Sequence, residues 1–199
     1  MKSPVIAFHP SNLLTCVSLT AGLGSIVSAL HGNAAAAGAL LAGAALCDTF
    51  DGWFARRFVR SVDLQSLGAQ LDSLVDAVAF GAAPVIATGI LIGATESLSW
   101  WSAAVGYAAC AIARLAFYNV SGGKGGFVGV PTPAAALTWS TALAFSPSVV
   151  TATALASALG IAMIAPLSIP RPGRTGLSAF AAWPVVLLIV HLSRWAVTT

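Results

Sequence analysis

Long apolar stretches, separated by short polar segments, make up most of this chain and restrict its fold more than any other feature. A helix needs roughly 20 apolar residues to cross a bilayer. Stretches close to this length recur between Pro10 and Leu192. Hydrophobic residues make up 58% of the 199 residues, charged residues make up 8%, and the mean hydropathy is +0.90. Soluble domains are much more highly charged. Because an α-helix pairs its own backbone N–H and C=O groups where no water is present, we expect an all-α integral membrane protein.

The apolar stretches predict six core transmembrane helices, one further C-terminal span and a cytoplasmic N-terminus. The expected spans begin near Pro10, Ala34, Gly68, Trp100, Val130, Val150 and Leu177. This orientation obeys the positive-inside rule because most basic residues then lie in the cytoplasm, namely Lys2, Arg56, Arg57, Arg60, Lys124, Arg171 and Arg174. Arg194 lies on the other side. We expect a multi-pass protein of the cell membrane, folded as one domain over residues 1–199, because no repeat or linker divides the chain.

The acidic residues are concentrated in one segment. Five of the six lie between Asp48 and Asp76. At 3.6 residues per turn, Asp48 and Asp51 share one helix face, and Asp72 and Asp76 share a face of the next helix. A charged group inside a membrane helix costs roughly 2.5 to 3.5 kcal/mol, so four carboxylates need a functional reason. Carboxylate oxygens suit Mg²⁺, Mn²⁺ or Ca²⁺, and the pattern predicts a site for such cations.

Small and basic residues accompany the first two aspartates. Gly52 and Ala55 lie on the carboxylate face and remove bulk where a phosphate-bearing ligand could approach the helix. Arg56 follows on the same face and can offer several N–H donors to phosphate. This segment therefore predicts binding of a phosphorylated ligand beside the cations.

The eight positions resemble the signature of the CDP-alcohol phosphatidyltransferase family, D-x-x-D-G-x-x-A-R followed by G-x-x-x-D-x-x-x-D. The matching residues are Asp48, Asp51, Gly52, Ala55, Arg56, Gly68, Asp72 and Asp76. The gap between the halves, residues 57–67, is long for the family, so we expect an unusual loop there. The resemblance implies a metal-dependent transferase that uses a CDP-activated lipid and two divalent cations, Mg²⁺ or Mn²⁺, with Ca²⁺ as another occupant.

The resemblance also implies roles for individual residues. Metal binding falls to Asp48, Asp51, Asp72 and Asp76, and Asp76 is also the expected general base. The family's P-N-x-L-T entry, present here with one extra residue, adds two residues to the expected nucleotide site. That site comprises Asn12, Thr15, Asp48, Gly52, Ala55 and Arg56.

Segments outside the signature narrow the resemblance to one branch of the family. The sequences DSLVDAVAFGAAP, FVGVPTPAAA and IPRPGR are similar to segments of bacterial and archaeal phosphatidylserine synthases. This similarity implies CDP-diacylglycerol and L-serine as substrates and a homodimer surrounded by membrane lipids. The residues expected to bind the acceptor or a lipid phosphate are Arg114, Asn119, Lys124, Arg171 and Arg174. Phe117 stands where relatives usually carry an arginine, which weakens the assignment of serine.

Other functions stay open at this point. The same chemistry could use glycerol 3-phosphate or inositol phosphate as the acceptor. A cation transporter could also bury acidic residues, and a structural membrane subunit is a third class. The transferase is favoured because neither of the others needs Gly52, Ala55 and Arg56 at this spacing. Nucleic acid is not an expected partner, because the basic residues are scattered and form no patch.

Overall fold

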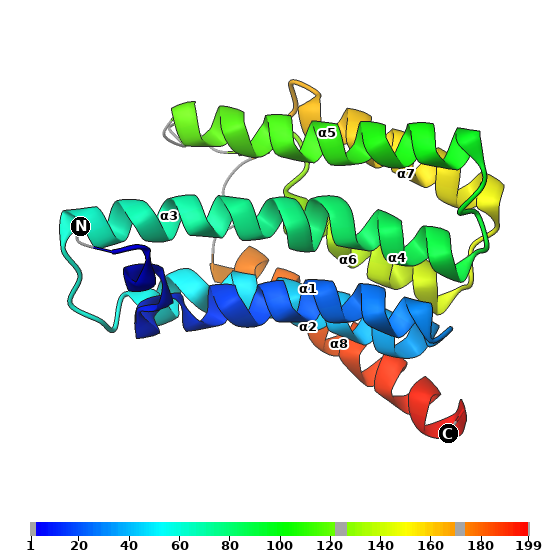
Figure 1. The fold of residues 1–199 in the computed structure, drawn as a ribbon, viewed down its shortest axis with the longest axis horizontal. Helices are drawn as coiled ribbons and strands as arrows, with labels where there is room; N and C mark the ends of the chain where they lie inside the picture. The colour runs from blue at the N-terminus through cyan, green and yellow to red at the C-terminus, as the bar shows by residue number, and fades with distance from the viewer. Residues whose placement is uncertain (1–2, 122–126, 170–173, 199) are drawn as a thin grey trace.

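The structure is a computed structural model, and it describes residues 3–121, 127–169 and 174–198. These residues are almost entirely helical (Figure 1). Two 3-10 turns, η1 (Pro4–Phe8) and η2 (Pro10–Asn12), lead into the bundle. The α-helices are α1 (Leu13–Leu30), α2 (Ala34–Ala55), α3 (Val62–Asp76), α4 (Ala83–Leu91), α5 (Leu98–Ser121), α6 (Thr132–Ala144), α7 (Val149–Ile164) and α8 (Arg174–Thr198). The all-α membrane fold predicted from the sequence is confirmed.

Five helices among the described residues are long and apolar enough to cross a membrane. They cover Pro10–Leu30, Ala34–Ala55, Val62–Leu91, Leu98–Ser121 and Phe180–Val197. The other two expected spans are shorter, since α7 has 16 residues and α6 has 13. The expected total of six core spans plus one, and the side on which the N-terminus lies, remain predictions.

The third span begins earlier than predicted from the sequence. Its helix begins at Val62 rather than near Gly68 and continues through a π-helical turn, η3 (Ala77–Ala82), into α4. The hydroxyl of Ser61 caps the new start by accepting the Leu64 N–H, and Asp63 lies in the first turn, where a carboxylate favours the helix dipole. Part of the long gap is therefore helix, and the unusual loop expected between the two halves stays a prediction.

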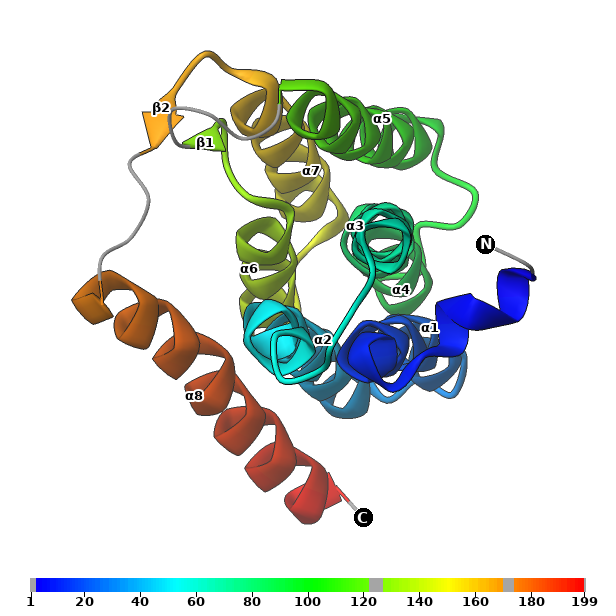
Figure 2. The same ribbon diagram turned by 90° about the vertical axis from the view of Figure 1, so that its left-hand side faces the viewer.

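Helices α1 and α2 pack together as a hairpin on one side of the bundle, and α5 packs with α7 on the other (Figures 1 and 2). Between them lie α6 and the α3–α4 span. Helix α8 packs on α2 and slants away from the other helices toward the C-terminus. Gly22 of α1 allows a close crossing with the π turn, since a Cβ there would lie 2.7 Å from Cα of Ala79.

The buried core centres on α6. Trp139 is fully buried, and its ring meets those of Trp100 and Tyr107 edge to face, with centroids 6.0 and 5.9 Å away. The Tyr107 hydroxyl donates to the Phe80 carbonyl in the π turn at 2.8 Å, which satisfies a buried backbone acceptor at the irregular turn. Two short strands, β1 (Phe127–Val128) and β2 (Ser168–Ile169), pair antiparallel and join the segment before α6 to the one after α7.

Candidate active site

The signature carboxylates of α2 and α3 converge in the wall of one cavity. One carboxylate oxygen from each of Asp48, Asp72 and Asp76 lies within 4.8 Å of the others. Asp48 of α2 lies beside Asp76 of α3, and Asp51 of α2 lies beside Asp72 of α3. Helical spacing explains this arrangement, because residues three or four apart point to the same side of a helix.

Two threonines hold the outer members of this carboxylate cluster. The hydroxyl of Thr15 on α1 lies 3.4 Å from Oδ2 of Asp51 and donates to it. The hydroxyl of Thr132, at the start of α6, lies 3.5 Å from Oδ2 of Asp76 and donates to it. Four helices therefore meet at the cluster, and two of the carboxylates have side-chain donors that limit their rotation.

The carboxylates line a cavity of about 590 Å³. All four signature aspartates lie in its wall, together with residues of α3, α5, α6 and α8. The lining residues outside the signature include Thr49, Ser73, Arg114, Tyr118, Asn119, Thr132 and Phe180. The wall thus combines acidic, basic, amide and hydroxyl groups with apolar surface, and this combination fits a ligand that has a phosphate, a polar head and a lipid tail.

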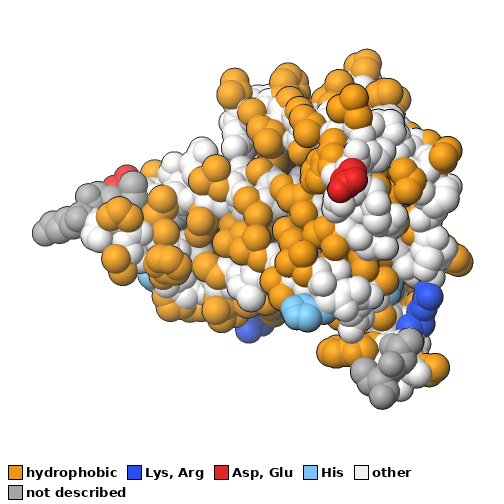
Figure 3. All heavy atoms as spheres, turned by 45° about the vertical axis from the view of Figure 1, so that its right-hand side comes forward, with side chains coloured by type: hydrophobic (Ala, Val, Ile, Leu, Met, Phe, Trp, Pro, Cys, Tyr) orange, Lys and Arg blue, Asp and Glu red, His pale blue; other side chains and the backbone are white. Residues whose placement is uncertain are grey.

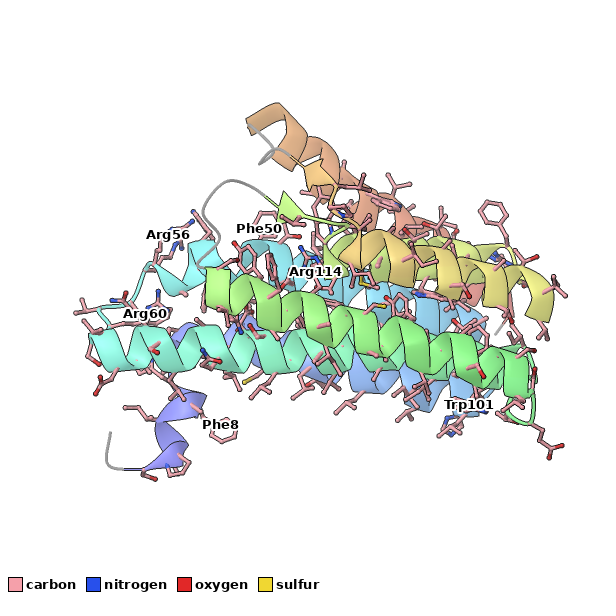
Figure 4. All side chains as sticks on the ribbon, turned by 90° about the horizontal axis from the view of Figure 1, so that it is seen from above. Phe8, Phe50, Arg56, Arg60, Trp101 and Arg114 are labelled. Carbon is pink, nitrogen blue, oxygen red and sulfur yellow. The ribbon has the colours of Figure 1, made fainter. Side chains whose placement is uncertain are left out.

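Arg114 is the basic residue of the cavity wall. Its side chain is only 8% exposed, and Nε has no hydrogen-bond partner among the described residues. Figure 4 shows Arg114 inside the bundle, whereas Arg56 and Arg60 lie toward the end where α2 joins α3. A buried guanidinium with an unsatisfied nitrogen, close to carboxylates, is suited to an anionic ligand that enters the cavity.

Asn119 and Ser73 form a polar pair beside Arg114. The Asn119 amide nitrogen lies 3.0 Å from the Ser73 hydroxyl, which lies 3.1 Å from the amide oxygen. This pair links α3 to α5 within the cavity wall. Two of the expected acceptor residues, Arg114 and Asn119, thus lie in one cavity with the carboxylates.

Several expected nucleotide residues lie outside this wall. Asn12 is buried, donates to the Ala7 carbonyl at 2.9 Å, and contacts Gly68, where a Cβ would lie 3.1 Å from its amide oxygen. Ala55 is buried, and Gly52 and Arg56 are exposed at the end of α2. Asn12 therefore supports the helix crossing, and Thr15 reaches the site only through Asp51.

Three of the expected phosphate contacts cannot be located. Lys124 and Arg171 lie outside the described residues. Arg174 is the first residue of α8, and only its backbone is described. Their roles stay predictions.

The cavity-lining residues that were not predicted from the sequence include Ser73, Tyr118, Thr132 and Phe180. Ser73 follows Asp72 directly, and Tyr118 lies one turn beyond Arg114, so helical spacing could have indicated both. Thr132 lies between two prolines at the start of α6. This sequence predicts a helix start but not a contact with α3. Phe180 reaches the site only because α8 folds back along α2.

The donor set fits hard divalent cations. The three clustered ligands are carboxylates, and neither histidine nor cysteine belongs to the cluster among the described residues. Mg²⁺, Mn²⁺ and Ca²⁺ prefer oxygen donors of this kind. Asp51 is not one of these three, although it lies beside Asp72 in the same wall.

Fold, carboxylate cluster and cavity together define a membrane-embedded transferase site. The family model of CDP-alcohol phosphatidyltransferases matches residues 8–168, and the chain belongs to this family. Members of the family generally use divalent metal ions, in agreement with the carboxylate cluster.

Named relatives are found in archaea and bacteria. The chain is 34% identical to the archaetidylserine synthase of Methanothermobacter thermautotrophicus over 84% of its own length and 72% of the relative's. It is 31% identical to the CDP-diacylglycerol–serine O-phosphatidyltransferase of Methanocaldococcus jannaschii, over 75% of this chain and 71% of the relative. The enzyme of the same name from Mycobacterium tuberculosis is 38% identical over 62% of this chain, a match that spans only 45% of the mycobacterial protein.

Proposed function

We propose that the chain transfers the phosphatidyl group of CDP-diacylglycerol to the hydroxyl of L-serine, forming phosphatidylserine and releasing CMP. The observation that carries this proposal is the convergence of three carboxylates, within 4.8 Å of one another, in the wall of a cavity that also contains buried Arg114. The names of the relatives support serine as the acceptor.

Asp76 is the proposed general base. It is the most buried of the cluster carboxylates, and Thr132 fixes one of its oxygens. The serine hydroxyl transfers its proton to Asp76 as its oxygen forms a bond to the phosphorus of the lipid. The phosphorus–oxygen bond to CMP breaks, and CMP leaves with the bonding electrons.

The remaining acidic residues position the donor lipid. Asp48, Asp51 and Asp72 with Asp76 would hold two divalent cations, Mg²⁺ or Mn²⁺, which would offset the charge of the phosphates when bound. Gly52 and Arg56 would accommodate the CDP group at the exposed end of α2. The lipid tails would reach the apolar part of the cavity, beside Phe180 of α8.

The acceptor site is proposed on the α5 side of the cavity. Arg114 would pair with the serine carboxylate because its guanidinium can form two parallel hydrogen bonds with a carboxylate. Ser73 and the amide oxygen of Asn119 would accept hydrogen bonds from the ammonium group. Phe117, which stands where relatives usually carry an arginine, is 59% exposed and does not line the cavity. The proposed acceptor site therefore does not use this position.

We also propose that the active site faces the cytoplasm of the cell, where serine is supplied and CMP is released. Residues 1–199 would act as a single transferase domain. The homodimer implied by the resemblance stays a prediction.

A product assay tests the reaction. Purified protein is incubated with Mg²⁺ or Mn²⁺, with CDP-diacylglycerol or its diether counterpart, and with serine, glycerol 3-phosphate or inositol phosphate. We expect a serine phospholipid and an equal amount of CMP, with both lost in EDTA and restored by excess metal. Asp72→Asn serves as the inactive control.

Other outcomes would overturn the proposal. Lipid formed only with another alcohol would change the acceptor but keep the reaction class. Full turnover in EDTA would exclude the metal-dependent mechanism. No lipid product, together with cation flux in vesicles that contain the protein, would replace the transferase with a transporter.

A further inference from the structure

Two adjoining hollows lie toward the end of the bundle opposite the carboxylate cluster. One is a groove of about 480 Å³ between the α1–α2 hairpin and the C-terminal part of α8, lined by Leu40, Gly43 and Leu188 among others. The other, of about 350 Å³, is lined by His191 and Arg194. His31 and Asn33, at the turn between α1 and α2, line both hollows, so the two meet there.

The groove has the form of a site for a hydrocarbon chain. It follows α2 from Asn33 to Gly43, ten residues, or about 15 Å of helix rise. Mostly apolar side chains line it, including Val27, Leu40 and Leu192. The face of the molecule drawn in Figure 3 carries many hydrophobic side chains and few charged ones. Because such a face contacts lipid in a membrane protein, an acyl chain is the occupant that fits the groove.

The polar end of the hollows complements an anionic head group. Arg194 supplies a permanent positive charge. His31, Asn33 and His191 add nitrogen-bearing side chains around it, and neither hollow includes an aspartate or glutamate among its described lining residues. Trp195 lies at the groove wall, in keeping with the preference of tryptophan for the head-group level.

His191 forms part of the wall of the smaller hollow. It is 1% exposed, and its Nε2 lies 3.2 Å from the Ser140 hydroxyl and 3.0 Å from the Ser140 carbonyl oxygen. Its ring packs so closely on Gly38 that a side chain there would collide with it. The ring is therefore held between Ser140 and Gly38, and it gives the smaller hollow a rigid wall.

We infer that the two hollows together bind one anionic phospholipid, from the membrane leaflet opposite the active site. One acyl chain occupies the groove beside Gly43, and the phosphodiester lies by Arg194 and His31. This site is separate from the substrate cavity, with which the hollows share no lining residue. The lipid would fill the groove between α8 and the α1–α2 hairpin and stabilise the packing of α8.

Lipid titration of the purified protein in detergent tests this inference. The probes are phosphatidylglycerol, phosphatidylcholine with the same acyl chains, and inorganic phosphate, with thermal unfolding and native mass spectrometry as readouts. We expect phosphatidylglycerol to raise Tm and to remain bound as one molecule, with little effect from the other two. Gly43→Leu, which fills the groove, and Arg194→Gln, which removes the charge, should each abolish the rise.

Two controls make the result specific. A Cβ added at Gly43 or at Gly106 of α5 meets nothing within 4 Å, so Gly106→Leu is a matched variant that should keep the rise in Tm. Asp72→Asn should also keep the rise in Tm, because that residue lies in the other cavity.

Equal stabilisation by phosphatidylcholine or phosphate, or a full rise in either Gly43→Leu or Arg194→Gln, would overturn the inference. Loss in Asp72→Asn would place the lipid in the substrate cavity, and a changed oligomeric state in Gly43→Leu would assign the groove to a second copy of the chain.

Discussion

Thr132 donates its hydroxyl hydrogen to Oδ2 of Asp76 across a distance of 3.5 Å, and this bond joins the start of α6 to the end of α3. Both side chains are buried. Pro131 and Pro133 flank Thr132 and fix the backbone from which the hydroxyl projects. The orientation of the proposed base is therefore set by a helix start that lies 56 residues away in the sequence.

Removal of this hydroxyl should slow the reaction without loss of the fold. Because the bond is long and an ordinary hydrogen bond contributes about 0.5–1.5 kcal/mol, Thr132→Val should lower kcat roughly two- to tenfold. Thr132→Ser should restore most of it, with KM for the CDP-lipid little changed. CMP release measures the effect. Thr138→Val is the matched control, because that hydroxyl bonds to Ala134 in its own helix. Equal loss in both valine variants would indicate a general packing defect.

The base and the metal ligands should respond differently to amide substitution. Asp76→Asn should retain CDP binding but lose turnover by about 10²- to 10⁴-fold, the usual contribution of general base catalysis. Asp48→Asn and Asp72→Asn should lose Mn²⁺ and CDP binding together. Calorimetric titration of both ligands into the three variants, beside CMP release, decides the matter. If Asp76→Asn loses both ligands as completely as the other two, Asp76 is primarily a ligand and not the base.

Gly52 offers a test of the nucleotide position. It is exposed, and a Cβ there would meet only Nη1 of Arg56, 3.7 Å away, so the fold should tolerate a larger residue. Gly52→Leu should nevertheless abolish CDP binding, because its side chain would fill the approach to α2. CDP affinity and Tm are the measurements, with Gly106→Leu as the control. Unchanged affinity in Gly52→Leu would place the nucleotide elsewhere.

Arg114 should govern affinity for the acceptor. Arg114→Lys keeps the charge but loses the paired donors that match a carboxylate, so KM for serine should rise about tenfold or more. KM for CDP-diacylglycerol should change little. Initial rates measured against each substrate separate the two effects. A rise confined to the KM of the CDP-lipid would instead assign Arg114 to the lipid phosphate.

Gly22 should be required for stability rather than for chemistry. Gly22→Ala puts a Cβ 2.7 Å from Ala79 in the π turn, and overpacking of this kind costs about 1–3 kcal/mol. Its Tm should fall. Gly106→Ala meets no neighbour and should match or exceed the wild type, because alanine favours helix over glycine. Equal Tm values for the two variants would show that α1 can move away from the π turn at little cost.

Much of the site could be predicted because it follows local spacing. The distances of three and four residues between Asp48 and Asp51, and between Asp72 and Asp76, determine which helix face each aspartate occupies. Hydropathy likewise indicated the long helices. Neither signal carries information on which helices meet, so the contact of Thr132 with Asp76 and the approach of Phe180 to the cavity appeared only in the structure.

Helix boundaries and the roles of single residues were harder to predict from the sequence. The apolar period of the third span becomes clear only near Gly68, yet Ser61 supplies a cap that lets the helix begin at Val62. Asn12 resembles a ligand-binding residue in its motif, but local hydrogen bonds and the contact with Gly68 occupy its side chain. A polar residue near a site can thus serve the helix crossing, and only the neighbours in space distinguish the two roles.

The π turn at Ala77–Ala82 has a consequence for insertions and deletions. A π turn contains about one residue more than an α turn, which rotates the following helix by about 100° relative to an uninterrupted α-helix. The face of α4 that packs inward is therefore offset from the face of α3 that carries the aspartates. Loss of one residue here would turn α4 away from its partners even if every remaining side chain were kept. The number of residues in this segment keeps the half of the span that carries the aspartates aligned with α4.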